Sequence, residues 1–558
     1  MKNAINRSGF LLWGLPLVLL LVFFFVPLAS ILRVMFERSG TITWSAVIKP
    51  LWFTIYQASL STLLTLLFGL PAAFVFARYN FTGRRALRLL TMLPFILPTV
   101  VAAAAFNALL GPRGWVNIIL MKFTASQVPP ITFLNTFWAI LLAHIFYNIA
   151  IIIRVVGSAW SQLDPRLEQS ARVLGASPLK TFTKLVFPLL RRSIFSATLL
   201  VFLFNFTSFG VILMLGGPGF ATLEVAIYTQ TLYYLNLPMA GLLSIIQLVC
   251  TLVILWLYNL GSQHQAVPLF PRLRGEGLAK PRALVEKFIV WLTVVFLILL
   301  QLFPLLALVS RSMLRLEPDR GQRGTVFGGF TLDFYRELFV NRHGSIFYVS
   351  PVAAISNSLQ YAAITMLISL IAGTLLAFAF VKRPAAKRWL DLLVMLPFGA
   401  SAVTLGLGFI VAFSNSPLAR TSFPWLVPLA HSLIAMPFVL RAVQPALASI
   451  PDSLRQSAAV LGATPLRVWW QVEMKLISRS LLMGGLFAFT ISLGEFGATS
   501  FIARADTPTM PVAIFRYLSQ PGALNYGQAL AMATILIVIC ALSIGLLESL
   551  SRAFNGTD

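Results

Sequence analysis

The sequence predicts an all-α polytopic membrane protein, with twelve transmembrane helices arranged as two parallel six-helix repeats. Hydrophobic residues make up 58% of the 558 positions and charged residues only 11%, a balance far from that of a soluble domain. Apolar runs long enough to span a bilayer recur along the whole chain. One polar segment also occurs twice, at a constant offset of 287 residues, so that Leu167 corresponds to Leu454. This repetition indicates an internal duplication.

The apolar runs define the twelve expected spans. The first, Ser8 to Leu32, has no charged residue and no small-residue cleavage site at its end, so we expect a retained span and not a removed signal peptide. Each half holds an even number of spans, so both halves start on the same side of the membrane and form parallel repeats. The other eleven runs are centred near residues 64, 98, 145, 203, 250, 297, 368, 400, 434, 490 and 537.

The halves are expected at residues 1–262 and 285–558, joined by a cytoplasmic linker over residues 263–284. The linker region, residues 261–281, is rich in proline and glycine, which is typical of a connecting segment. Between spans three and four the two halves differ in length, because Leu93-Pro94-Phe95 recurs only at an offset of 303 residues.

The distribution of basic residues predicts the orientation of the chain. The net charge of +25 is spread through the loops and forms no single face, which favours membrane topology over nucleic-acid binding. Residues 215–238 contain no Lys or Arg, whereas the loops between spans two and three, four and five, six and seven, and eight and nine are basic. Under the positive-inside rule these basic loops and both termini are cytoplasmic. The basic segment 311–350, external in this arrangement, is a counter-signal.

The duplicated polar segment, residues 161–192 and 448–479, lies in the cytoplasmic loop between the fourth and fifth spans of each half. In the first copy, Asp164 followed by Pro165 is a helix N-cap with proline at the first helical position. We expect Asp452 to cap the helix of the second copy in the same way.

Each copy then predicts a glycine corner between two helices. The first helix reaches Gly175 or Gly462, a residue type that adopts the left-handed conformation ending a helix. Ser177-Pro178 and Thr464-Pro465 follow as a new cap and first turn, so a second helix leaves at a new angle. Ordinary helix packing and a lever moved by a cytoplasmic partner both fit this pattern. We call the two units knob 1 (residues 161–185) and knob 2 (residues 450–472).

The pattern Leu-Glu-Gln-Ser-Ala-Arg-x-Leu-Gly-Ala-Ser-Pro resembles the EAA loop of type I permeases in binding-protein-dependent ABC importers. The resemblance covers essentially the whole chain, twice, and the layout is that of the fused double permeases of the ferric-iron and thiamine import families. LLGPRGWVN, LLAHIFYN, SFGVILMLGG and TLEVAIY are similar to their sequences. The sequence departs from the pattern where Gln169 and Gln456 replace the glutamate for which the loop is named, and Ser170 and Ser457 replace its following alanine. Because glutamine is uncharged, neither position offers a charge for a contact with the ATPase.

This resemblance implies the transmembrane subunit of an ATP-driven importer in a bacterial cytoplasmic membrane, working by alternating access on a small solute that is ferric iron or thiamine-like. It implies two cytoplasmic ABC ATPase subunits and an extracytoplasmic solute-binding protein as partners, and no nucleic acid. It assigns contact with the ATPases to residues of both knobs: Gln169, Ser170, Ala171, Leu174, Gly175, Ser177, Pro178, Gln456, Ser457, Ala458, Leu461, Gly462, Thr464 and Pro465.

Few features of the sequence indicate an enzyme. It has no Gly-x-x-x-x-Gly-Lys-Ser/Thr loop to cradle ATP phosphates, so ATP is expected on a partner chain and no cofactor on this one. A nucleophile elbow, a paired-cysteine zinc site and an HExxH motif are also missing. We therefore predict neither catalytic nor metal-binding residues.

Polar residues inside the spans are the candidates for a translocation path or gate. A carboxylate such as Glu495 is costly inside a membrane and faces either a protein interior or a water-filled path. Ser208 is its repeat equivalent, and His144 and His431 are equivalent to each other. Pairing within the helix bundle is the alternative role for all four.

Two rival functions stay open on sequence alone. A twelve-span secondary transporter driven by an ion gradient also has two parallel six-span halves, but its recognisable loop between spans two and three is missing here. A membrane scaffold that binds a cytoplasmic partner without transporting anything is the second rival. Neither composition nor spacing selects a substrate.

Overall fold

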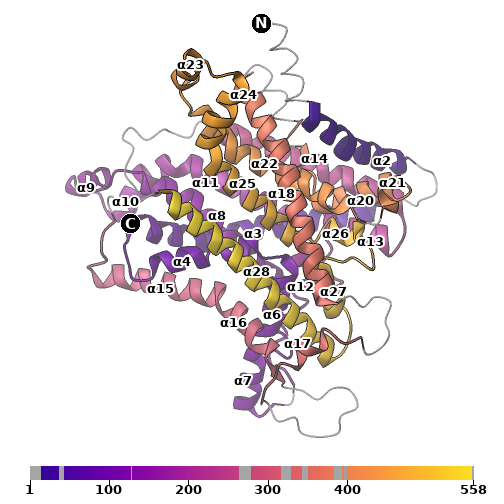
Figure 1. Cartoon of the computed structure of the whole chain (residues 1–558). Helices are drawn as coiled ribbons and strands as arrows, with labels where there is room; N and C mark the ends of the chain where they lie inside the picture. Colours follow the sequence, from indigo (N-terminus) through magenta and orange to yellow (C-terminus); the bar gives the residue numbers. More distant parts are fainter. Residues whose placement is uncertain are drawn as a thin grey trace.

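The computed structural model describes residues 14–36, 43–126, 128–262, 278–315, 329–341, 350–382, 393–421 without 395 and 398, and 423–555, and it is predominantly helical (Figure 1). The first half contains η1 (Leu21–Phe25), α2 (Val26–Met35), α3 (Trp44–Arg78), α4 (Arg84–Leu90), α5 (Leu93–Ile96), α6 (Thr99–Leu110), α7 (Trp115–Thr124), α8 (Phe137–Ser161), α9 (Pro165–Val173), α10 (Pro178–Thr181), η2 (Phe182–Val186), α11 (Phe187–Phe206), α12 (Gly210–Leu215), α13 (Leu223–Leu232) and α14 (Leu237–Ser262), where η marks a π-helical turn.

The second half repeats this order, with a short antiparallel pair of strands inserted between its first and second long spans. Its elements are α15 (Leu284–Gln301), α16 (Phe303–Ser312), β1 (Leu314–Arg315), β2 (Gly329–Phe330), α17 (Asp333–Glu337), α18 (Pro351–Lys382), α20 (Ala402–Phe413), α21 (Pro417–Arg420), α22 (Leu426–Ala448), α23 (Asp452–Val460), α24 (Pro465–Val468), η3 (Trp469–Glu473), α25 (Met474–Gly494), α26 (Thr499–Ile502), α27 (Met510–Leu518) and α28 (Ala523–Asn555).

The predicted all-α membrane fold is confirmed, and ten of the expected spans appear as long helices. Within the described ranges, ten helices are long and apolar enough to cross a membrane. The spans expected near residues 98 and 400 are instead short helices, α5 with α6 and α20. Pro98, which has no N–H to donate, is extended at φ −57°, ψ 143° and separates α5 from α6. Ser401 stands before α20 at a similar φ and ψ and accepts a hydrogen bond from the backbone N–H of Thr404.

The two halves are built alike and are interlocked. In the first half α3, α8 and α11 pack together, and their repeat equivalents α18, α22 and α25 pack together in the second. The first span of each half contacts the third-span helix of the other half, because α2 packs against α20 and α16 packs against α6. The two largest buried apolar clusters therefore draw residues from both halves, while a smaller third cluster lies within the first half.

Buried amides of Asn148, Asn205 and Gln247 join the helices. Asn148 Nδ2 donates to Asn205 Oδ1 at 2.7 Å, and Asn205 Nδ2 donates to Thr62 Oγ1 at 3.1 Å. Gln247 Nε2 donates to Glu224 Oε1 at 2.9 Å. Such bonds satisfy polar groups that have no water to bind inside a membrane.

Most of the predicted linker, residues 263–277, lies outside the described residues, and the boundaries between the halves stay a prediction. The chain is described again from residue 278, where Ala279 runs beside the end of α3. The backbone N–H of Asn80 donates to Ala279 O at 2.9 Å, and Ala279 N donates to Arg78 O at 2.9 Å.

Candidate functional site

The knobs have nearly the same local structure in both halves, set by capping. In knob 1 the backbone N–H of Arg166 donates to Asp164 Oδ1 at 3.0 Å, which confirms the predicted cap of α9. Gly175 has φ +79°, and Ala176 N donates back to Ala171 O at 3.0 Å, the bond pattern of a left-handed helix end.

Knob 2 repeats the corner but not the first cap. Gly462 has φ +80°, as predicted. Asp452, however, does not cap α23, so that prediction is wrong. It is the first residue of the helix, and its Oδ1 instead lies 2.6 Å from Arg455 Nη1. The reason is the reversed order Pro451-Asp452, which puts a proline, with no side-chain acceptor, at the position that Asp164 occupies in knob 1.

The second helix of each knob is capped and then runs directly into a long span. Ser177 Oγ accepts from the backbone N–H of Lys180 at 3.3 Å, and Thr464 Oγ1 accepts from that of Arg467 at 3.4 Å. One π-helical turn follows in each half, η2 or η3, and continues without a break into α11 or α25. The second helix of each knob and the following span therefore form one continuous helical segment.

An ion pair holds the first helix of each knob, to the end of α3 in knob 1 and to η3, just before α25, in knob 2. Arg78 at the end of α3 pairs with Glu168 of α9. In knob 2, Arg455 Nε lies 2.7 Å from Oε1 of the buried Glu473 in η3. Partial burial lowers the pKa of Arg455, but hydrogen bonds donated to Glu473 and Asp452 outweigh burial and raise that pKa overall.

The predicted coupling residues form an exposed surface on both knobs. All of them are exposed except Ala171 and Ala458, which are half-buried. Leu174 and Leu461, at equivalent positions, are 86% and 87% exposed. In Figure 1, α9 protrudes at the left edge of the molecule and α23 at its top, while α7 and α17 lie at the bottom. Apolar side chains gathered on an otherwise polar surface indicate a protein contact site.

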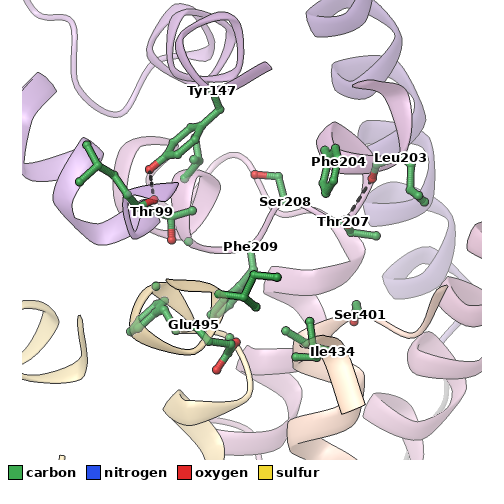
Figure 2. A pocket seen from close by; sticks show the side chains of 18 of the residues that line it. Thr99, Tyr147, Leu203, Phe204, Thr207, Ser208, Phe209, Ser401, Ile434 and Glu495 are labelled. Atoms are coloured by element: carbon green, nitrogen blue, oxygen red, sulfur yellow. Dashed lines mark hydrogen bonds between the residues drawn. The ribbon is translucent and has the colours of Figure 1, made fainter. Parts of the chain in front are cut away.

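Between the halves lies a cavity of about 350 Å³. Figure 2 shows Ser208 and Phe209 of the first half and Ser401, Ile434 and Glu495 of the second around one space. The lining residues come from the α5–α6 break, α8, α11 and the turn after it, and from their counterparts in the second half: Leu97, Thr99, His144, Tyr147, Asn148, Leu203, Phe204, Thr207, Ser208, Phe209, Gly210, Val211, Pro397, Ala400, Ser401, Ala402, Ile434, Phe438, Phe487, Thr490, Ile491, Gly494, Glu495, Phe496 and Gly497.

Four aromatic rings meet at one boundary of this cavity. Phe209 and Phe496, which are repeat equivalents, stack with centroids 5.7 Å apart and planes 17° apart. Tyr228 lies 5.1 Å from Phe209, and its equivalent Phe515 lies 5.3 Å from Phe496. A twenty-residue helix such as α11 extends about 30 Å. Because α11 and α25 both start at the knobs, this aromatic cluster lies at the end of these helices away from the knobs.

The two intramembrane histidines bridge helices in related ways. His144 Nδ1 lies 2.8 Å from Ser61 Oγ, and its Nε2 lies 2.9 Å from Ser208 Oγ. His431 Nδ1 lies 2.8 Å from Ser492 Oγ, and its Nε2 lies 3.0 Å from Glu495 Oε2. Glu495 thus stands beside His431 as Ser208 stands beside His144.

Glu495 is held by further donors in the turn that follows α25. Its Oε1 accepts from the backbone N–H of Ala498 at 2.9 Å, and its Oε2 accepts from that of Thr499 at 3.0 Å. The Thr499 hydroxyl donates to Oε2 at 2.6 Å. Hydrogen bonds from backbone N–H groups and a hydroxyl stabilise an ionised carboxylate.

The structure brings together three of the four predicted path residues. Ser208, His144 and Glu495 line the cavity, whereas His431 is buried behind Glu495. The four members of the aromatic cluster are not among the predicted path residues, although they are repeat-matched in the sequence. In the described residues no group of three or more His, Cys, Asp or Glu is placed to hold a metal ion.

Two repeated helical halves around a shared cavity, each with a protruding knob, define a polytopic membrane transport subunit. The chain belongs to the family described as binding-protein-dependent transport system inner membrane component, whose model matches it twice, over residues 65–266 and 366–556. The family places the chain in the inner membrane as a multi-pass protein.

Curated relatives resemble the chain over nearly its whole length. The thiamine transport system permease protein ThiP of Escherichia coli (strain K12) is 27% identical over 533 residues, covering 92% of both chains. ThiP of Haemophilus influenzae is 25% identical over 558 residues, covering 97% of this chain and 96% of the relative. The ferric transport system permease protein FbpB of Actinobacillus pleuropneumoniae is 24% identical over 566 residues, 96% of this chain and 78% of the relative.

Proposed function

We propose that this chain is the transmembrane subunit of an ATP-driven importer, with both halves fused in one polypeptide. The main support for this proposal is that each knob is continuous with a helix that reaches the cavity. Each knob leads through a π-helical turn into α11 or α25, and the far ends of these helices line the central cavity. A partner that moves the knobs would therefore move the walls of the cavity.

The partners follow from the family and the two knobs. One cytoplasmic ABC ATPase subunit would bind each knob, and an extracytoplasmic solute-binding protein would deliver the solute. ATP would be bound by the ATPases, with no cofactor on this chain. Both termini would lie in the cytoplasm, on the side of the knobs. The relatives are named for thiamine and ferric transport, so thiamine and ferric iron are the candidate solutes.

Alternating access would work through the aromatic cluster. Closure of the ATPases would bring the knobs together and separate the ends of α11 and α25, opening the stack of Phe209 on Phe496. Return of the ATPases would close it again. The stack stabilises the closed arrangement by about 0.5–1.5 kcal/mol beyond the area that it buries, an amount that conformational coupling can overcome.

The test uses Gly175→Val and Gly462→Val. A Cβ at either glycine meets no atom within 4 Å, so the added side chain has room. The positive φ adds roughly 1 kcal/mol or more of backbone strain, which reorients the helix after the corner. We expect both variants to insert normally but to lose the co-purifying ATPase and ATP-dependent uptake.

Gly219→Val is the matched control. A Cβ at Gly219 also meets no atom within 4 Å, but the residue does not have a positive φ. It should retain both the ATPase and uptake. If the two knob variants behave like this control, the knobs are ordinary helix packing and the coupling role is wrong.

A further inference from the structure

The charge on the cavity wall is opposite in sign to that of the chain. The sequence contains 42 Lys and Arg residues against 17 Asp and Glu. Among the described residues that line the cavity there is no Lys or Arg, and Glu495 is the one acidic residue. A single carboxylate in a low-dielectric enclosure attracts a cation and disfavours an anion.

Glu495 has an oxygen suited to a ligand. Oε2 is occupied by Thr499 and His431, whereas Oε1 has the backbone N–H of Ala498 as its one donor in the described structure. A carboxylate oxygen has two lone pairs, so Oε1 retains acceptor capacity. The donors on both oxygens also fix the carboxylate in place, which lowers the entropic cost of binding a solute.

The rest of the cavity wall is mostly aromatic or apolar. Aromatic faces attract cations, and an enclosure of such faces recognises quaternary nitrogen. A volume of about 350 Å³ falls in the range of sites for small organic molecules and is far larger than one metal ion needs. The aromatic lining residues come from both halves and are Tyr147, Phe204, Phe209, Phe438, Phe487 and Phe496.

A metal ion fits this wall less well. Protein sites hold metal ions through several ligands, and ions that prefer oxygen are held by carboxylates, carbonyls and water. The described lining offers one carboxylate. The Tyr147 hydroxyl already donates to the backbone oxygens of Leu97 and Pro98, at 3.3 and 3.0 Å.

We propose that the cavity is a binding site for a singly charged organic cation with a flat aromatic ring, whose charge is met by Glu495 and whose ring packs against the aromatic wall. The inference rests on the proposed function, because the solute must pass through this cavity. It narrows the two candidate solutes to the thiamine-like class and assigns the specificity for charge to one residue.

The repeat provides a test that separates this role from a structural one. Ser208 occupies the place of Glu495 in the other half, beside His144, and lines the same cavity. Glu495→Ser removes the charge, and Ser208→Glu in the same chain restores it from the opposite wall. A role limited to holding the Ala498–Thr499 turn cannot be restored in this way.

The experiment measures binding of radiolabelled thiamine to the full chain in lipid nanodiscs, with thermal unfolding as a check on folding. We expect thiamine to bind and to be displaced by benzyltrimethylammonium but not by ferric citrate. Glu495→Gln, which keeps the shape of the side chain, should weaken binding by about tenfold to a hundredfold, the range for a lost charge-assisted contact. Phe438→Leu should weaken it by a smaller factor.

The double variant Ser208→Glu, Glu495→Ser should bind thiamine more tightly than Glu495→Ser alone, by about tenfold. Equal binding by these two chains, or binding of ferric citrate that depends on Glu495, would overturn the inference, as would no thiamine binding by the folded wild-type chain. The knob variants test the proposed function separately. A chain that couples to its ATPase but does not bind thiamine would contradict the cation site and leave the proposed importer function intact.

Discussion

The exposed leucines of the knobs give the sharpest quantitative test of ATPase docking. Leu174 and Leu461 are 86% and 87% exposed, so their contribution to folding is small. Substitution by serine should change the free energy of unfolding by no more than about 0.5 kcal/mol, as for other surface sites. Burying a leucine side chain fully in a partner stabilises the complex by about 1.5–3 kcal/mol. Each Leu→Ser change should therefore weaken ATPase binding by about tenfold to a hundredfold.

The assay compares the affinity of the purified ATPase for nanodisc-embedded Leu174→Ser, Leu461→Ser and the double variant. Because the two knobs belong to different halves and share no partner, the losses in binding free energy should add. Val128→Ser is the control: this residue is 70% exposed and lies in the connection between α7 and α8, outside both knobs. Unchanged affinity in the leucine variants, or an equal loss in the control, would refute the docking role.

Three further predictions concern the knob anchor, the aromatic cluster and the topology. Arg455→Ala should lower the free energy of unfolding by about 1–3 kcal/mol in thermal or denaturant unfolding, because it leaves a buried carboxylate without its ion pair. Asp452→Ala, at an 82% exposed side chain, should cost far less, and equal losses would contradict this account. Phe496→Ala should open the aromatic cluster and allow solute uptake without the binding protein. Uptake that still requires the binding protein would show that another part of the chain closes the cavity. Cysteines at Ser177 and Ser126 should differ in labelling by an impermeant thiol reagent in intact cells, with Ser177 protected, and labelling at Ser177 would reverse the predicted orientation.

Local features of this protein could be predicted because they depend on neighbours in the chain. The left-handed corners at Gly175 and Gly462 and the caps at Ser177 and Thr464 follow from steric and hydrogen-bonding preferences over a few residues. The same reasoning was wrong at Asp452, where the preceding proline takes the cap position. Hydropathy located ten long helices but did not anticipate that the third spans break into short ones.

The sequence by itself determined the membrane class, the duplication and the two knobs, because hydrophobic run length, self-similarity and capping are properties of contiguous residues. Only the tertiary structure decided which residues form the cavity. Phe209 stacks on Phe496, and α2 packs on α20, across hundreds of intervening residues. No local preference encodes such pairings, since they arise when two halves bury their apolar faces against each other. The same packing brings Glu495 and its equivalent Ser208 to the wall of one cavity.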